Sequence, residues 1–306
     1  MIRLALITQA DQLASLHKTE TSLACARLRG IELTVVTDMS HKQELHQSDQ
    51  FDAVLIHAPI DCRNELTCHF AKSGKHVLIY GPLSATMNDA SKLIACCREG
   101  NVRLMIGGTV RFQPAIIAIK GALDSNRLGI PALLRSHSWR AIEPAEVVDN
   151  EQQLFEQLDL AMWIFDGLPT TVFATRHDDR TDTLQIHVGY PSGGMGLITI
   201  CKSLPAGHRY CSCSLIGSNG AAYSDDLRQM QLLFQGNSPR AERTTEGILS
   251  HVEELREFVT AIEQQREPSV SGADGQQALQ LAIAVRRSIE IQQPLKLEGG
   301  SYVPVN

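Results

Sequence analysis

The stretch Ser73-Gly74-Lys75-His76-Val77-Leu78-Ile79-Tyr80-Gly81-Pro82-Leu83 decides the fold of this chain. Its centre, His76 to Tyr80, is a short apolar run of the kind that forms a strand buried on both faces of a parallel sheet. Gly74 provides the residue that ends a preceding helix, because glycine adopts the left-handed conformation of a helix cap without strain. The stretch therefore predicts one inner strand of a sheet that helices cover.

The same pattern recurs along the first third of the chain, where apolar runs alternate with helix-like segments. We expect the other strands at Ile2–Thr8, Ile31–Thr37, Asp52–His57 and Val102–Gly107, and helices at Leu13–Leu28 and Asn88–Arg98. This alternation is typical of an α/β fold in which helices flank a doubly wound parallel sheet. We predict a Rossmann-like domain over residues 1–115.

The pattern changes after Pro114. We expect helices at Ile116–Leu123 and Gln152–Phe165, strands at Ala132–Arg140, Thr183–Val188, Leu197–Leu204 and Arg209–Ile216, and two closing helices, the first with a stripe of Ile248, Val252, Leu255, Val259 and Ile262. Apolar and polar residues alternate in these strands, so one face of the sheet is buried. We predict a second α/β domain over residues 116–306, with a large open mixed or antiparallel sheet.

The composition excludes several classes of protein. With 306 residues, 43% of them hydrophobic and 20% charged, the chain is globular and long enough for two cores. Its 28 basic residues against 34 acidic ones give a net charge of −6, so we expect neither nucleic acid nor an anionic membrane as a partner.

The cysteines and histidines give no sign of a metal centre. Eight cysteines form no C-x-x-C pair, and eleven histidines form no H-x-x-x-H or H-E-x-x-H pattern. The first residues, Met1 to Ile7, form an apolar strand without the basic region of a signal peptide. We therefore expect reduced thiols, no metal and a cytoplasmic location.

The turn after the first strand is the place where a Rossmann domain usually binds the pyrophosphate of a dinucleotide. The usual motif is G-x-G-x-x-G, because only glycine lets the backbone approach the phosphates closely. Here the turn reads Thr8-Gln9-Ala10-Asp11-Gln12-Leu13, so side chains fill all three glycine positions and Asp11 adds a negative charge. We expect a dinucleotide to bind weakly or not at all.

Asp38 follows the second strand and has two interpretations. A carboxylate at this position usually accepts hydrogen bonds from the ribose hydroxyls, which would favour NAD over NADP as the cofactor. An aspartate at a strand end also caps the following turn, without any ligand.

The chain resembles the family of glucose-fructose oxidoreductase, inositol dehydrogenase and MocA. The similar segments are Asp52–Pro59, Ser73–Leu83, Gly107–Pro114, Arg127–Ile130, Leu158–Trp163 and Gly217–Gly220. The resemblance implies a Rossmann domain joined to an α/β domain, and dimers or tetramers assembled through the large sheet of the second domain. It also implies hydride transfer between NAD(P) and a sugar, cyclitol or related polyol.

The resemblance assigns cofactor-binding positions to Thr8, Gln9, Ala10, Asp38, Pro59, Tyr80, Gly81 and Pro82. The lysine of the family's E-K-P motif falls on Gly81. The family's aspartate and its proton-accepting histidine fall on Gln152 and Glu156, and a frequent histidine falls on Arg63. Only the later aspartate is retained, as Asp159.

Glu156 and Asp159 are the candidate catalytic residues, and Gln152 and Arg111 are the candidate ligand-binding residues. Gln152, Glu156 and Asp159 share one helix face. Glu156 can act as a base if burial and the charge of Asp159 raise its pKa, whereas the alternative is a polar face toward a solvated cleft. Arg111, after the fifth strand, is suited to an anionic or polyhydroxy ligand.

Two functional hypotheses follow. In the first, the chain is a divergent member of this family that is weak or inactive as a dehydrogenase and serves as a ligand-binding or regulatory homologue. In the second, it is an NAD-dependent oxidoreductase of a sugar, cyclitol or related polyol, with a site rebuilt around Glu156. Both predict a small, polar, sugar-like ligand and a homodimer or homotetramer.

Overall fold

The computed structural model describes residues 2–8, 16–36, 50–141, 151–177, 182–205, 208–225, 230–235, 238–243 and 248–305. By packing, the chain divides into two compact units. Unit 1 comprises Met1–Thr109, Ala145–Phe155 and Gly247–Leu279, and unit 2 comprises Val110–Pro144, Glu156–Glu246 and Gln280–Asn306. The boundary between residues 115 and 116 stays a prediction, although packing places residues 247–279 with the N-terminal unit.

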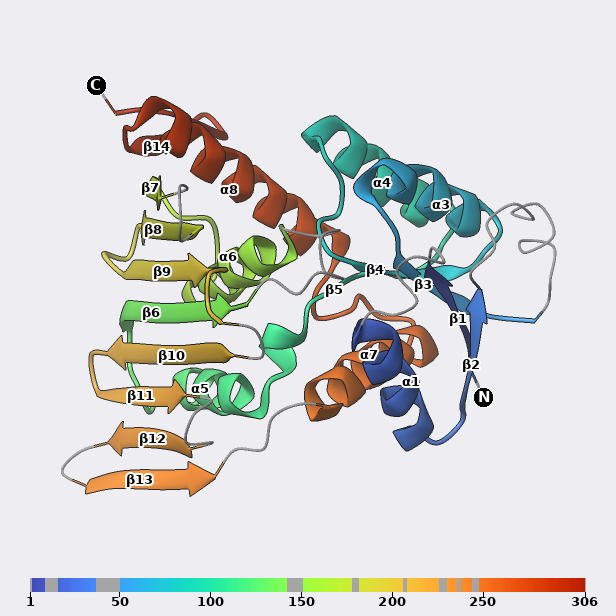
Figure 1. Cartoon of the computed structure of the whole chain (residues 1–306), viewed down its shortest axis with the longest axis horizontal. Coiled ribbons are helices and arrows are strands. Elements are labelled where there is room, and N and C mark those ends of the chain that lie inside the picture. Colours follow the sequence, from blue (N-terminus) through green and yellow to red (C-terminus); the bar gives the residue numbers. More distant parts are fainter. Residues whose placement is uncertain are drawn as a thin grey trace. The chain divides into compact units, whose positions relative to one another are not determined.

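Unit 1 contains a parallel sheet of five strands in the order β2-β1-β3-β4-β5 (Figure 1). The strands are β1 (Ile2–Thr8), β2 (Ile31–Val36), β3 (Ala53–His57), β4 (His76–Tyr80) and β5 (Leu104–Gly107). The predicted Rossmann-like sheet is confirmed. The central strands are buried because helices lie on both faces of such a sheet.

The helices of unit 1 come from both ends of the sequence. They are α1 (Leu16–Arg27), α3 (Ile60–Lys72), α4 (Met87–Glu99), α7 (Ile248–Glu263) and the first part of α8 (Gly272–Ile291). Helix α3 is the helix expected before Gly74, although the sequence did not give its bounds, and Arg63 and Thr67 occupy buried positions on it that an apolar stripe would normally fill. Helix α7 packs against α1, although more than 200 residues separate them in the chain.

An ion pair joins the beginnings of β1 and β3. The carboxylate of Asp52 accepts hydrogen bonds from the backbone N–H, Nε and Nη2 of Arg3, at 2.9, 3.2 and 2.8 Å. The backbone N–H of Asp52 in turn donates to the oxygen of Arg3 at 2.8 Å. These bonds stabilise the register in which Leu4 pairs with Ala53.

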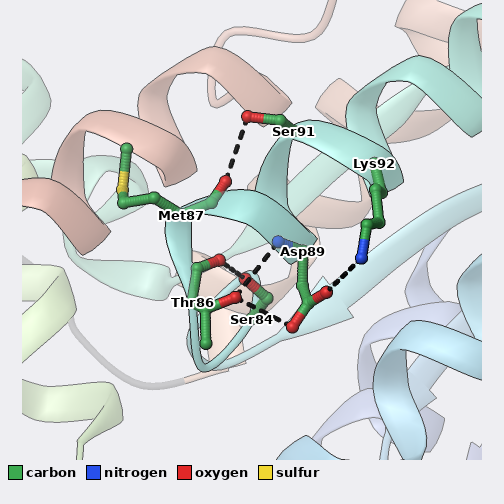
Figure 2. A network of polar contacts seen from close by, with 6 residues as sticks. All are labelled: Ser84, Thr86, Met87, Asp89, Ser91 and Lys92. Carbon is green, nitrogen blue, oxygen red and sulfur yellow. Dashed lines mark hydrogen bonds and ion pairs between the residues drawn. The ribbon is translucent and has the colours of Figure 1, made fainter.

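The start of α4 is capped by side chains of the loop that follows β4 (Figure 2). Thr86 Oγ1 accepts the backbone N–H of Asp89 at 3.1 Å and donates to the Asp89 carboxylate at 2.8 Å. Ser84 Oγ donates to the backbone oxygen of Thr86, and Lys92 pairs with Asp89. Helix caps satisfy backbone N–H groups that lack partners inside the helix, so this network fixes where the loop ends.

Unit 2 contains a ten-stranded sheet in the order β13-β12-β11-β10-β6-β9-β8-β7-β14-β15. The strands are β6 (Pro131–Arg140), β7 (Thr171–His177), β8 (Thr183–Gly189), β9 (Met195–Cys201), β10 (Arg209–Gly217), β11 (Gly220–Asp225), β12 (Met230–Gln235), β13 (Ser238–Arg243), β14 (Leu295–Glu298) and β15 (Ser301–Pro304). Because β6 and β9 pair in parallel and the other pairs are antiparallel, the predicted mixed sheet is confirmed.

The two faces of this sheet differ in burial. Leu134, Ile186 and Ile198 point to the buried face, against which α5 (Pro114–Asp124) and α6 (Gln152–Phe165) lie (Figure 1). The opposite face carries partly exposed aromatic side chains, including Trp139 and Tyr210, whose rings lie 5.2 Å apart. In the described part of the chain, no helix is long and apolar enough to cross a membrane.

Candidate functional site

The carboxyl ends of the parallel strands in unit 1 form the first candidate site. Strand β2 lies on one side of β1 and β3 lies on the other, so the topology switches direction between β1 and β3. Ligands of open α/β sheets bind in the crevice at such a switch point. Thr8 and His57, which pair as the last residues of the two strands, mark it here.

Thr8 closes β1 with a buried side chain, only 2% exposed, whose hydroxyl has no partner among the described residues. Gln9, Ala10, Leu13 and Asp38, which the sequence analysis assigned to the cofactor site, lie outside the described residues. The expectation of weak dinucleotide binding therefore stays a prediction.

Tyr80 is the last residue of β4, and Gly81 and Pro82 begin the turn after it. The Tyr80 ring is buried and meets the ring of His57 edge-on, with 6.2 Å between the centroids. Burial raises the pKa of the Tyr80 phenol, and the nearby Glu254 carboxylate raises it further. Gly81 has a φ of 93°, a backbone conformation that residues with a side chain rarely adopt.

Arg63 connects two of these strand ends. Its side chain is buried in the first turn of α3, where Nε donates to the backbone oxygen of Ala58 at 2.7 Å. Its Nη1 donates to the backbone oxygen of Pro82 at 2.8 Å. Arg63, at the position where the family often has a histidine, thus joins the turns after β3 and β4. Pro59, directly before α3, lies in the first of these turns.

Glu254 is a residue of this edge that the sequence analysis missed. It is fully buried on α7, and its carboxylate accepts the backbone N–H of Gly108, directly after β5, at 2.7 Å. The sequence spacing of Glu254 could have indicated its burial. It lies four residues before Phe258 and seven before Ala261, so it shares the buried face of the helix with them. A carboxylate on such a face indicates a specific partner.

The candidate catalytic residues lie on α6, whose predicted bounds are confirmed. Gln152, Glu156 and Asp159 follow one another at intervals of four and three residues. Both oxygens of the Asp159 carboxylate accept hydrogen bonds from Arg111, which reaches it from the 3₁₀ turn η2 (Thr109–Phe112), with Nε to Oδ2 at 2.5 Å.

This ion pair changes the electrostatics expected for the site. Arg111 is 6% exposed and Asp159 is 14% exposed, and the Arg111 guanidinium also lies 5.3 Å from the ring centre of Trp163. The sequence pattern favours Asp159 as a negative charge that raises the pKa of Glu156, and Arg111 as a ligand-binding cation. In the structure, each of these two charges is compensated by the other.

The described residues cover only part of the site that a nicotinamide dinucleotide takes on a Rossmann sheet. The switch point and the buried Thr8 hydroxyl fit the position that such a cofactor takes on a Rossmann sheet. Gly81 itself offers no side chain to a ligand at this turn. Among the described residues, no group of three His, Cys, Asp or Glu side chains is arranged to hold a metal ion.

Comparison with models of protein families gives two matches, one in each half of the chain. A family model described as an oxidoreductase family with an NAD-binding Rossmann fold matches residues 9–108. The model of the C-terminal alpha/beta domain of the same oxidoreductase family matches residues 153–297.

The chain is also similar to individual proteins. It is 27% identical to a myo-inositol 2-dehydrogenase of Thermotoga maritima, over 89% of this chain and 88% of that protein. Among solved structures, an oxidoreductase from Agrobacterium radiobacter in complex with NAD+, L-tartaric acid and magnesium has a TM-score of 0.84 and 16% identity, covering 96% of this chain and 98% of that one. A levoglucosan dehydrogenase in complex with NADH and levoglucosan has a TM-score of 0.82 and 15% identity, covering 96% and 99%.

Proposed function

Because the chain belongs to the oxidoreductase family of glucose-fructose oxidoreductase, inositol dehydrogenase and MocA, we propose that it is a divergent member that retains a site for a small, polar, sugar-like ligand. In this proposal it is weak or inactive as a dehydrogenase and serves as a ligand-binding or regulatory homologue. A shared fold does not by itself establish an activity, so the argument depends on the residues of the site.

The observation that carries this proposal is the backbone of Gly81. The family resemblance places a lysine here, but a φ of 93° strains any residue that has a Cβ atom. The difference is therefore larger than the loss of one amino group, because the turn itself has a conformation that suits glycine.

The environment of α6 supports the same proposal. Proton transfer from an alcohol is best served by a base whose pKa lies near the working pH, whereas an ordinary glutamate has a pKa of about 4.3. Arg111 compensates the charge of Asp159, so Asp159 is not an uncompensated negative charge one helical turn from Glu156. Loss of one positioned acid or base costs roughly 10²- to 10⁴-fold in rate.

The second candidate function is NAD-dependent oxidation of a sugar, cyclitol or related polyol with Glu156 as the base. The position of Glu156 favours it, because Glu156 lies one helical turn before Asp159, which Arg111 holds in a fixed orientation. The dehydrogenases to which the chain is similar, acting on myo-inositol and levoglucosan, indicate the class of substrate to examine.

Calorimetric titration with NADH and NADPH tests the proposal. We expect no saturable binding up to about 1 mM cofactor, which corresponds to a binding free energy weaker than about −4 kcal/mol. A parallel thermal-shift screen with myo-inositol, D-xylose and levoglucosan is expected to give stabilisation by at least one of these polyols.

A low-micromolar dissociation constant for either cofactor, together with NADH production from a polyol, would overturn the proposal. The variant Glu156→Gln then decides the second candidate, because it keeps the size of the side chain and removes the base. A roughly 10²-fold or greater loss of that activity would identify Glu156 as the base.

The proposal also covers location and assembly. The eight cysteines form no C-x-x-C pair, which fits reduced thiols. Because thiols commonly stay reduced in the cytoplasm, this supports a cytoplasmic location. A homodimer or homotetramer formed through the ten-stranded sheet is supported by the partly exposed apolar side chains on one face of that sheet.

A further inference from the structure

Two cysteines that are 28 residues apart in the sequence lie side by side in unit 1. Cys68 belongs to α3 and Cys96 belongs to α4, and the two helices pack against each other. The thiol of Cys96 donates a hydrogen bond to the backbone oxygen of Cys68 at 3.7 Å. Nothing in the spacing of these residues indicates that they meet.

Close approach of the two backbones brings the thiols together. At the end of α4, a Cβ atom on Gly100 would lie only 2.3 Å from the backbone oxygen of Ala71 in α3, so a glycine is needed there. Cys96 and Cys68 lie about one helical turn before these two residues. A disulfide requires Cα atoms about 4.4 to 6.8 Å apart, and a close contact between two helices favours such a separation.

The two thiols differ in accessibility. Cys68 is partly exposed, whereas Cys96 is buried, with 8% exposure. Cys97 is also buried, and it follows Cys96 on the same helix. A reagent from solution therefore meets Cys68 first.

We propose that Cys68 and Cys96 form a reversible disulfide by exchange with a low-molecular-weight disulfide such as glutathione disulfide. The Cys68 thiolate attacks one sulfur of glutathione disulfide, which gives a mixed disulfide and releases one glutathione. The Cys96 thiolate then attacks the Cys68 sulfur and releases the second glutathione. Both protons pass to glutathione, the protein thiols are oxidised, and glutathione disulfide is reduced.

The surroundings of the pair make this exchange slow at neutral pH. Burial raises the pKa of the Cys68 thiol to about 12, with further contributions from the hydrogen bond to Cys96 and from the charges of Cys96 and Glu99, while Lys72 lowers it. Since the thiolate is the nucleophile, the reaction speeds up as pH rises toward this pKa. Proximity of the second thiol then favours closure over a lasting mixed disulfide.

A disulfide at this position would join two helices that flank the turn after β4. Helix α3 carries Arg63, which donates to the backbone oxygen of Pro82, and α4 begins at the cap formed by Thr86. The bond would therefore restrain both ends of the segment from Pro82 to Thr86. This inference is independent of the proposed function.

Peptide mapping of the full-length protein tests the inference. The reduced protein is incubated with glutathione disulfide at pH 7, 8 and 9, its free thiols are alkylated, and it is digested with trypsin. Cleavage after Arg63, Lys72, Lys92 and Arg98 gives the peptides 64–72 and 93–98, of which the first contains only Cys68. We expect these two peptides linked by a disulfide, with a rate that rises about tenfold per pH unit.

Serine variants identify the partner, because peptide 93–98 contains both Cys96 and Cys97. We expect Cys97→Ser to retain the linked peptides, and Cys96→Ser to stop at the mixed disulfide of Cys68 with glutathione. Linked peptides in Cys96→Ser, or a wild-type protein that accumulates only glutathione adducts or free thiols at these positions, would overturn the inference. Far-ultraviolet circular dichroism confirms that each variant is folded.

Discussion

Gly81 shows how one residue can change what the turn after β4 is able to do. Its φ of 93° belongs to a region that costs residues with a Cβ atom roughly 1–2 kcal/mol. We therefore expect Gly81→Lys to lower the free energy of unfolding by about that amount and to leave the protein without dehydrogenase activity, because Glu156 and Gln152 would still differ from the family pattern.

Urea unfolding and an assay of NADH production measure these two effects. Gly81→Asn is the matched control, because asparagine tolerates a positive φ better than other residues, so its loss of stability should be smaller. Rapid NADH production from any polyol by Gly81→Lys would refute this interpretation of the turn.

The pair of Arg3 and Asp52 gives a prediction of pH dependence. Hydrogen bonds from Arg3 lower the pKa of the Asp52 carboxyl, and its partial burial opposes this effect. A carboxyl whose pKa is lower in the folded protein contributes stability above its unfolded pKa of about 3.9, and this contribution is lost as pH falls through the lower, folded value.

We expect Asp52→Asn to destabilise the protein at pH 7 by about 0.5–1 kcal/mol, a small value because both side chains are 38% exposed to solvent. The difference from the wild type should shrink as pH falls from 5 to 3, as measured by urea unfolding at each pH. A difference that stays constant over this range would mean that the charge of Asp52 contributes nothing.

Single residues were the least predictable part of the site. The sequence assigned no role to Glu254 and no contact to Arg63, because their partners lie just after β3, β4 and β5, which only the tertiary structure brings close. The same holds for Arg111 and Asp159, whose ion pair spans 48 residues. The proposed catalytic and ligand-binding roles of these residues stay predictions.

Among the elements, α4 offers a direct test of local stabilisation. Thr86 caps the helix through its hydroxyl, which accepts the backbone N–H of Asp89 (Figure 2). We expect Thr86→Ala to lower the free energy of unfolding by about 1 kcal/mol, because the N–H loses its partner. Thr86→Ser keeps the hydroxyl and should stay close to the wild type in chemical denaturation; equal losses in both variants would argue against a capping role.

Elements with regular patterns were predicted well. The bounds of β1, β4 and α6 agree with the expected ranges, since each has a short apolar run or a clear helical period. Six strands of the large sheet, β7 and β11 to β15, were not predicted. Several of them contain few apolar residues, such as the edge strand β13 with the sequence Ser-Pro-Arg-Ala-Glu-Arg. An edge strand can form through backbone pairing alone, so its sequence need not show an apolar pattern.

At the scale of the whole molecule, the large sheet predicts self-association. Met195 in β9 is 57% exposed, and Leu197 on the same face is partly exposed. We expect light scattering at micromolar concentration to give the mass of a dimer or tetramer. The double variant Met195→Glu/Leu197→Glu should shift this mass to that of the monomer, because it places charges within the proposed interface.

Leu23→Glu is the matched control, since Leu23 is 53% exposed on α1 of the other unit. It adds one negative charge to the unit that does not contain this sheet and should leave the mass unchanged. A strictly monomeric wild type under these conditions would contradict the proposed assembly.

Fold class and family were within reach of the sequence, because alternating strands and helices and several short motifs run along most of the chain. The order of strands in the large sheet could not be predicted from the sequence. The parallel pairing of β6 with β9 and its antiparallel pairing with β10 depend on long-range contacts. The assignment of residues 247–279 to unit 1 was equally beyond local patterns.

The packing of α7 against α1 has a consequence for biosynthesis. A nascent chain can pair β1 to β5 early, but the partner helix of α1, and with it the acceptor for the Gly108 N–H, emerges from the ribosome only after the ten-stranded sheet has largely been translated. A fragment that stops before Gly247 therefore exposes an unsatisfied helix surface, and the N-terminal unit should mature late and attract chaperones until translation ends.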